Sequence, residues 1–187
     1  MQNKILIAIT GATGVDLAIK LLETLKIKKI DVELIISKNA QKIISIETDY
    51  EISEIQKIAD KNYNEKDLHA GPASGSYKKN SSMIVIPCSM KTLSSIANGY
   101  ANNLITRAAD VMIKEKRKLI LVVRESPFSA IHLENMLKLA RLGVVILPPI
   151  PSYYIRPKSV EELVTFTVGR ILDQIGIESD IYRWGNQ

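Results

Sequence analysis

The feature that most constrains this chain is an apolar run near its start that ends in a glycine-rich turn. Residues 4–9 read KILIAI, the turn is Thr10-Gly11-Ala12-Thr13-Gly14, and apolar residues at helical spacing follow over 17–25. A short continuous apolar run is typical of a strand that is buried on both faces of a parallel sheet. The sequence therefore predicts a strand, a tight turn and a helix, and the helix start is suited to an anion such as phosphate.

The rest of the chain alternates between short apolar runs and stretches with helical periodicity. Further strands are predicted at 32–36, 83–86, 119–123 and 144–147, and helices at 39–47, 52–60, 90–97, 103–115, 129–142 and about 160–175. Pro87 is expected to stop the strand before it, and Ser159 and Glu162 to form a capping box. Small residues and prolines indicate loops at 69–76 and 151–158. This alternation predicts a single α/β domain over residues 1–187, with a parallel sheet and helices on both faces.

Composition narrows the class of protein. The net charge is +5, but the basic residues are scattered apart from 114–118, and aromatic residues make up only 5%. Without a nucleic-acid motif or an apolar run of membrane-spanning length, we expect a small anionic ligand rather than nucleic acid or a membrane. One cysteine and two histidines predict no internal disulfide and no metal site. A strand that begins almost at residue 1 leaves no room for a signal peptide, so we expect a cytoplasmic protein.

Ligands of such folds bind where the parallel strands end. The turn after the first strand is Gly-x-x-Gly rather than the three-glycine dinucleotide fingerprint, and Ser37-Lys38 stands where an NAD site places an acid. A hydroxyl and a cation suit phosphate or the edge of a flavin better, which disfavours a nicotinamide oxidoreductase. Hydroxyl groups at Ser89, Thr92 and Ser94 follow a later strand and are suited to a second polar group of the ligand.

Several of these residues also have a purely structural interpretation. Ser37 and Ser89 are suited to helix caps, and Arg124 and Glu125 to a mutual ion pair. Cys88 is expected to be a small residue at a crowded strand end, because a thiolate nucleophile needs a base and none is adjacent. Arg107 and Lys114 lie seven residues apart, on one face of a predicted helix, where either is also consistent with a surface charge.

In blocks spread from residue 4 to Trp184, the chain resembles the UbiX/Pad1 flavin prenyltransferases. The blocks are 10–14, 36–38, 47–49, 72–76, 87–89, 102–105, 107–110, 124–129 and 131–136, in the family's order. The resemblance implies a three-layer Rossmann-like flavoprotein fold and a homododecamer. It implies a metal-independent reaction that joins a dimethylallyl group from dimethylallyl phosphate to N5 and C6 of reduced FMN. The product, prenylated FMN, is the cofactor of UbiD-type decarboxylases.

The resemblance also implies roles for the residues at matching positions. The positions that match FMN-binding residues are Gly11, Ala12, Thr13, Ser37, Ser89, Met90, Lys91, Thr92 and Arg124. Those that match catalytic residues are Glu47, Arg107, Lys114 and Glu125, and Tyr154 and Arg170 match the dimethylallyl phosphate site. Without a metal, cations must offset the charge on the departing phosphate, and either glutamate is suited to handle the proton lost from flavin C6. His132 and Trp184 match family positions too, but we expect structural roles for both.

Two other functions are weighed against this one. An FMN-dependent cysteine decarboxylase of the phosphopantothenoylcysteine type would share the Asn-rich helix start. It should carry a histidine near the first helix and a P-x-M-N-x-x-M motif, whereas residues 11–30 hold no histidine and the motif is absent. A non-catalytic flavin carrier or decarboxylase subunit would not need the charged residues that match the catalytic positions.

Overall fold

One six-stranded sheet, entirely parallel, forms the centre of the computed structural model, which describes residues 4–185. The strand order is β3-β2-β1-β4-β5-β6. The strands are β1 Lys4–Ile9, β2 Val32–Ile36, β3 Lys61–Tyr63, β4 Asn80–Cys88, β5 Lys118–Val123 and β6 Val145–Ile146. The predicted α/β class with a parallel sheet is confirmed.

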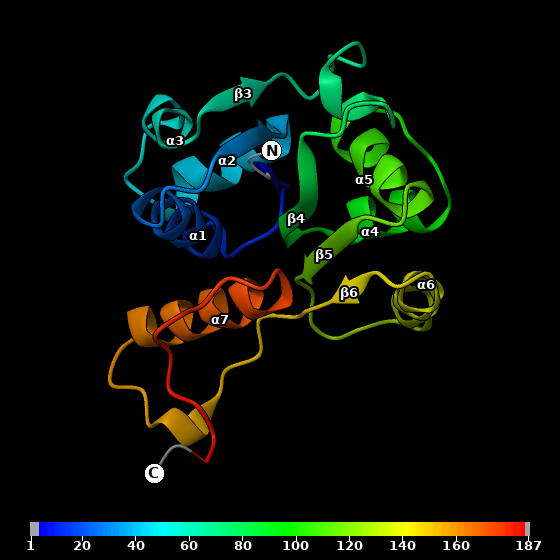
Figure 1. Cartoon of the computed structure of the whole chain (residues 1–187). Coiled ribbons are helices and arrows are strands. Elements are labelled where there is room, and N and C mark those ends of the chain that lie inside the picture. The colour runs from blue at the N-terminus through cyan, green and yellow to red at the C-terminus, as the bar shows by residue number, and fades with distance from the viewer. Residues whose placement is uncertain (1–3, 186–187) are drawn as a thin grey trace.

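Helices cover both faces of the sheet and complete three layers. They are α1 Val15–Ile27, α2 Lys38–Glu47, α3 Ile52–Ile58, α4 Met90–Ala97, α5 Leu104–Lys114, α6 Ala130–Arg141 and α7 Val160–Gln174. Two short 3-10 turns, η1 Gly71–Ala73 and η2 Tyr153–Ile155, lie in the loops predicted at 69–76 and 151–158. Figure 1 shows α1, α2 and α3 to the left of the sheet, α4, α5 and α6 to the right, and α7 below.

Side chains that alternate along each strand divide the core in two. In β1, Ile5, Ile7 and Ile9 pack with apolar residues of α1, α2, α3 and α7, which form the first face. Leu6 and Ala8 point the other way and pack with residues of α4, α5 and α6, which form the second face. Strands buried on both faces have no polar side to alternate with, which explains the unbroken apolar runs.

The structure differs from the sequence prediction at two strands. β3 was not predicted, because Lys61, Asn62 and Tyr63 form no apolar run. These residues become an edge strand by pairing with β2. β4 does not stop before Pro87 but continues through it to Cys88. The pairing of β4 with β5 shifts register between Val85 and Cys88, so the missing N–H of Pro87 falls at an irregularity of the ladder.

Predicted helix caps are present, with one change. The hydroxyl of Ser159 accepts from the Glu162 N–H at 3.2 Å, but the Glu162 carboxylate accepts from Lys158 N at 2.7 Å and not from Ser159. The structural role expected for His132 is confirmed, because its Nδ1 accepts from Ser129 N in a capping box at the start of α6. Between residues 4 and 185, no helix combines the length and the apolar character needed to cross a membrane.

Candidate functional site

The turns at the carboxyl ends of β1 and β4 are tied together by one buried threonine. Thr10 donates its hydroxyl to the carbonyl of Pro87 at 2.7 Å and accepts from Ser89 N at 2.9 Å. The side chain is 2% exposed, so both bonds form away from water. This threonine fixes the turn that begins at Gly11 beside the start of α4, because each neutral hydrogen bond contributes on the order of 1 kcal/mol.

Three helices begin around a hollow at this edge. Ser37 caps α2, since its hydroxyl accepts from Ala40 N at 3.1 Å, and Ser89 caps α4 by accepting from Thr92 N at 3.4 Å. Asn103 caps α5 in the same way, through Thr106 N at 2.9 Å. Helix N-termini carry partial positive charge, so their convergence favours a ligand with an anionic or oxygen-rich end.

The hollow has a volume of about 250 Å³ and is lined by five of the predicted FMN-binding residues. These five are Gly11, Ser37, Ser89, Lys91 and Thr92. Ala12 and Thr13 follow Gly11 in the same half-buried turn, and Met90 packs against the core of the second face. Arg124 is exposed at the end of β5, where its N–H donates to the Cys88 carbonyl at 3.1 Å.

Glu65 is a residue of the hollow that sequence reasoning missed. Its carboxylate accepts from Lys38 N at 2.8 Å, its carbonyl accepts from Leu104 N at 2.7 Å, and its side chain lines the hollow beside Ser37. Glu65 therefore joins the starts of α2 and α5. It lies in the part of the chain between 52 and 69 that matched no family block, so the sequence offered no signal for it.

Glu47 binds the N-terminus of α1, the helix start predicted to hold phosphate. Its Oε2 accepts from Gly14 N at 2.9 Å and from Val15 N at 3.3 Å. The anion at this helix start is therefore a carboxylate of the chain itself. Burial and the neighbouring Glu47 charge raise the pKa of Asp16, which lies in the first turn of the same helix.

The predicted dimethylallyl phosphate residues, Tyr154 and Arg170, line a separate and larger pocket of about 700 Å³. The pocket lies between β6 and its following loop, α7, and the C-terminal segment, which we define as residues 179–184. The Tyr154 ring meets Phe166 at 5.7 Å, Tyr182 at 6.0 Å and Trp184 at 5.3 Å between centroids. Figure 1 shows this C-terminal segment running back along α7 towards η2.

A half-buried carboxylate, Asp173, holds two arginines at this pocket. Asp173 accepts from Arg170 Nη1 at 2.8 Å and binds Arg183 through both guanidinium nitrogens, at 2.7 and 2.8 Å. The hydrogen bonds from Arg183, together with both positive charges, lower the pKa of Asp173. The i,i+3 spacing of Arg170 and Asp173 on a helix was the one signal in the sequence, and it is a weak one.

Arg107 and Lys114 lie on α5, on the second face of the sheet. Arg107 donates from Nε to the Ala73 carbonyl at 3.0 Å and pairs with Asp110 at 2.6 Å. Lys114 pairs with Glu115, and a Cβ atom on Gly75 would lie 2.7 Å from its Nζ. Both cations therefore lie on one face of α5, as their spacing predicted, and this face is turned to the loop over 71–77.

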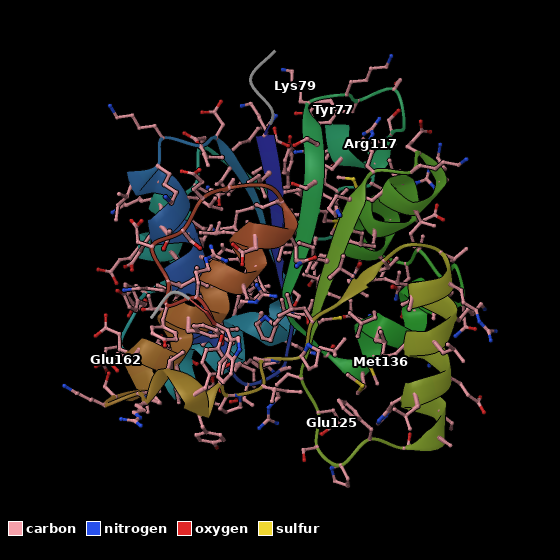
Figure 2. The ribbon with its side chains drawn as sticks, turned by 60° about the horizontal axis from the view of Figure 1, so that its bottom comes forward. Tyr77, Lys79, Arg117, Glu125, Met136 and Glu162 are labelled. Carbon is pink, nitrogen blue, oxygen red and sulfur yellow. The ribbon has the colours of Figure 1, made fainter. Side chains whose placement is uncertain are left out.

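The C-terminal end of α5 and Glu125 lie at opposite ends of the parallel strands. Arg117, three residues beyond Lys114, binds the carbonyls of Gly75 and Tyr77 at 2.7 and 2.8 Å. Figure 2 shows Tyr77, Lys79 and Arg117 at one end of the sheet and Glu125 at the other. The fold of one chain therefore does not bring Lys114 to Glu125.

Glu125 and Cys88 complete the set of predicted residues. Glu125 is exposed and its carboxylate accepts from Ser126 N at 3.0 Å; among the described residues it forms no ion pair with Arg124. Cys88 is free and fully buried, and burial raises the pKa of its thiol. The structural interpretation of Cys88 therefore fits the structure. Within 4–185, no three His, Cys, Asp or Glu side chains cluster closely enough to hold a metal ion.

Comparison with known proteins identifies close relatives. The flavoprotein family model matches residues 1–172. The flavin prenyltransferase UbiX of Methanocaldococcus jannaschii is 52% identical over 97% of this chain and 98% of its own length. The mitochondrial flavin prenyltransferase PAD1 of Saccharomyces cerevisiae is also 52% identical, over 97% of this chain and 75% of its own length.

Solved structures agree with these relatives. The crystal structure of AnUbiX (PadA1) in complex with FMN and dimethylallyl pyrophosphate has a TM-score of 0.97 and 45% identity, with 100% of both chains covered. A dodecameric FMN-dependent UbiX-like decarboxylase from Escherichia coli O157:H7 has a TM-score of 0.95 and 46% identity, over 98% of this chain and 100% of that one. The FMN-dependent cysteine decarboxylase TvaF is only 15% identical, with a TM-score of 0.65 over 80% of this chain and 91% of its own, and shares the fold alone.

Proposed function

This chain belongs to the UbiX flavin prenyltransferases of the flavoprotein family, and we propose that it joins a dimethylallyl group to N5 and C6 of reduced FMN. The donor we propose is dimethylallyl phosphate, and the product is prenylated FMN. The assignment rests on two flavin prenyltransferases that are each 52% identical to this chain over 97% of its length. The cysteine decarboxylase alternative is disfavoured, since that class resembles the chain only in fold.

The hollow at the carboxyl edge suits the oxygen-rich part of FMN. Hydroxyls of Ser37, Ser89 and Thr92 and the ammonium of Lys91 supply donors, and three helix starts add partial positive charge. At about 250 Å³ the hollow is smaller than the roughly 300–1,000 Å³ typical of ligand pockets, so it accepts part of a flavin. We propose that the phosphate and ribityl chain lie there, with Gly11, Ala12, Thr13, Met90 and Arg124 around them. When bound, FMN supplies the nucleophilic ring atoms.

The larger pocket suits an isoprenoid phosphate. Its aromatic rings, with Tyr154 at their centre, offer an apolar surface for a dimethylallyl group, and Arg170 offers a guanidinium for its phosphate. Breaking the allylic C–O bond sends its electron pair to the phosphate and leaves a carbocation. We propose that Arg170, Arg107 and Lys114 offset the charge that develops on the phosphate, while aromatic faces stabilise the cation.

Two carboxylates are available for the proton that must leave flavin C6. Glu47 lies at the turn that follows β1, beside the proposed flavin site, and Glu125 follows β5 at the same edge of the sheet. A carboxylate is a suitable general base when it lies within hydrogen-bond reach of the proton. We propose that one of the two accepts this proton and that the other is available to protonate the departing phosphate.

The separation of the proposed residues supports a site built from more than one copy of the chain. Arg107 and Lys114 lie on α5, on the second face, whereas Arg170 lies on α7, on the first face. The sheet stands between the two groups. Since an E. coli relative of known structure is dodecameric, we propose a homododecamer in which α5 of one copy completes the site of another.

We further propose that prenylated FMN passes to a UbiD-type decarboxylase, that the reaction needs no metal ion and that the protein works in the cytoplasm as a single domain. These proposals follow from the family and stay predictions for this chain.

The product of the reaction gives the test of the function. Anaerobic incubation of the purified protein with reduced FMN and dimethylallyl phosphate is expected to yield a flavin that is heavier by one prenyl unit, as measured by mass spectrometry. Boiled protein serves as the control. Unmodified FMN alone, with both monophosphate and diphosphate donors, would leave a flavin carrier as the better assignment.

A further inference from the structure

We propose that Asp173 is a positioning residue of the prenyl transfer, which orients Arg170 and fixes the C-terminal segment as one wall of the dimethylallyl pocket. The inference rests on the proposed function of that pocket. Asp173 lies on α7, one turn beyond Arg170, and was not among the residues that the sequence singled out. It does not need to touch the substrate, because it acts through the groups that it holds.

The first support is the geometry of the carboxylate. Asp173 Oδ2 accepts from Arg170 Nη1 at 2.8 Å and from Arg183 Nη1 at 2.7 Å, and Oδ1 accepts from Arg183 Nη2 at 2.8 Å. The Asp173 side chain is 17% exposed, whereas Arg170 is 50% exposed. The Arg183 side chain is 37% exposed, so the strength of this pair comes from its two-pronged geometry, which is more directional than a single hydrogen bond between charged groups.

The second support is the close approach of the C-terminal segment to α7. A Cβ atom on Gly169 would clash with Ile181 Cγ2 and would lie 3.1 Å from Ser179 Oγ. Arg183 Nη2 also donates to the Ser179 carbonyl at 3.3 Å, which closes the segment on itself. The absence of a side chain at position 169 lets the segment lie directly on the helix, beside the ion pair.

These contacts determine the shape and the charge of the pocket. Tyr182 and Trp184 flank Arg183 in the chain and place their rings 6.0 and 5.3 Å from that of Tyr154. Asp173 neutralises one of the two guanidinium charges, so the cluster with Arg170 and Arg183 keeps a net charge of about +1. Both Nη groups of Arg183 donate to Asp173, so Arg170 is the guanidinium that we expect to face an anionic substrate.

The experiment compares Asp173→Asn with the native oligomer in two measurements. The first is hydrogen exchange by mass spectrometry over residues 177–185, and the second is steady-state prenylation with dimethylallyl phosphate. Loss of the charge is expected to raise exchange over the segment about tenfold and to raise KM for dimethylallyl phosphate about tenfold. The affinity for FMN is expected to stay unchanged, since the proposed FMN hollow lies elsewhere.

Two further variants serve as a second test of the ion pair and as a control. Arg183→Lys retains the charge but loses the two-pronged bond, so it is expected to loosen the segment and raise KM in the same direction. Glu161→Gln serves as the matched control, because Glu161 lies on α7 like Asp173 but forms an exposed ion pair with Lys20 of α1, at 3.1 Å. It is expected to change neither measurement.

The two measurements separate this inference from the proposed function. A rise in KM without faster exchange, or faster exchange without a rise in KM, would overturn the positioning role. Unchanged exchange in both Asp173→Asn and Arg183→Lys would overturn it as well. If the native protein prenylates no flavin, the proposed function fails, whereas the exchange measurement still decides whether Asp173 holds the segment.

Discussion

Two inactive variants of this protein, Lys114→Ala and Arg170→Ala, are expected to recover activity when their chains assemble together. Each variant alone is expected to lose about 100-fold or more in kcat/KM, because each lacks a cation proposed to offset the phosphate charge. Lys114 lies on α5 and Arg170 on α7, on opposite faces of the sheet. If every site takes α5 from one copy and α7 from another, some mixed sites contain both cations.

Coexpression with two different tags, followed by purification on both, gives mixed oligomers for the assay. Random assembly is expected to return about a quarter of the native activity, since each of the two copies at a site carries the needed residue half of the time. The control mixes Lys114→Ala with Arg107→Ala. Both residues come from α5, so no site regains the full set and activity is expected to stay low. Equal recovery in the two mixtures, or none in either, would contradict a shared site.

Replacing Glu33 by alanine is expected to destabilise the protein by about 2–4 kcal/mol. Glu33 lies in β2 with no exposed surface, accepts from the Tyr77 hydroxyl at 2.7 Å and accepts from Asn80 Nδ2 at 3.0 Å. Burial, with Glu33 as hydrogen-bond partner, raises the pKa of Tyr77, which keeps its hydroxyl a donor. Without the carboxylate, the half-buried Tyr77 hydroxyl and the buried Asn80 amide lose their acceptor beside a cavity.

Urea unfolding followed by circular dichroism measures this loss as a shift of the midpoint at constant slope. Glu33→Gln keeps the volume and one acceptor, so its loss is expected to be smaller. Glu161→Ala, on an exposed helix face, is expected to change the free energy of unfolding by less than about 0.5 kcal/mol. A Glu33→Ala midpoint equal to that of the Glu161 variant would show that the buried network contributes nothing to stability.

Local sequence predicted the elements that bury apolar side chains on both faces. The runs that became β1 and β2 and the helix that became α1 needed no knowledge of their partners, because their residue patterns permit few alternatives. β3 escaped prediction because Lys61 and Asn62 are exposed and only the edge of β2 makes them a strand. The prediction that Pro87 stops its strand was wrong for a related reason, since the register shift that accommodates this proline depends on pairing with β5.

The residues of the candidate site also fall into two groups, those that local sequence could predict and those that it could not. Ser37 and Ser89 could be placed at strand ends from the chain alone, since the fold class fixes where its strands end. Glu65 and Asp173 could not, because each acquires its role from a contact outside its own element: with Leu104 of α5 for Glu65, and with Arg183 of the C-terminal segment for Asp173. The separation of Lys114 from Glu125 could be predicted, because the strand expected at 119–123 lies between them and places them at its opposite ends.

A crystal structure of the assembled protein with FMN and dimethylallyl phosphate decides whether two copies share each site. We expect Lys114 and Arg107 of one copy to reach the phosphate of a donor that lies between the flavin and the Tyr154 and Arg170 side chains of another copy. Ammonium and guanidinium groups of α5 that point into bulk solvent, with the donor phosphate bound elsewhere, would contradict it.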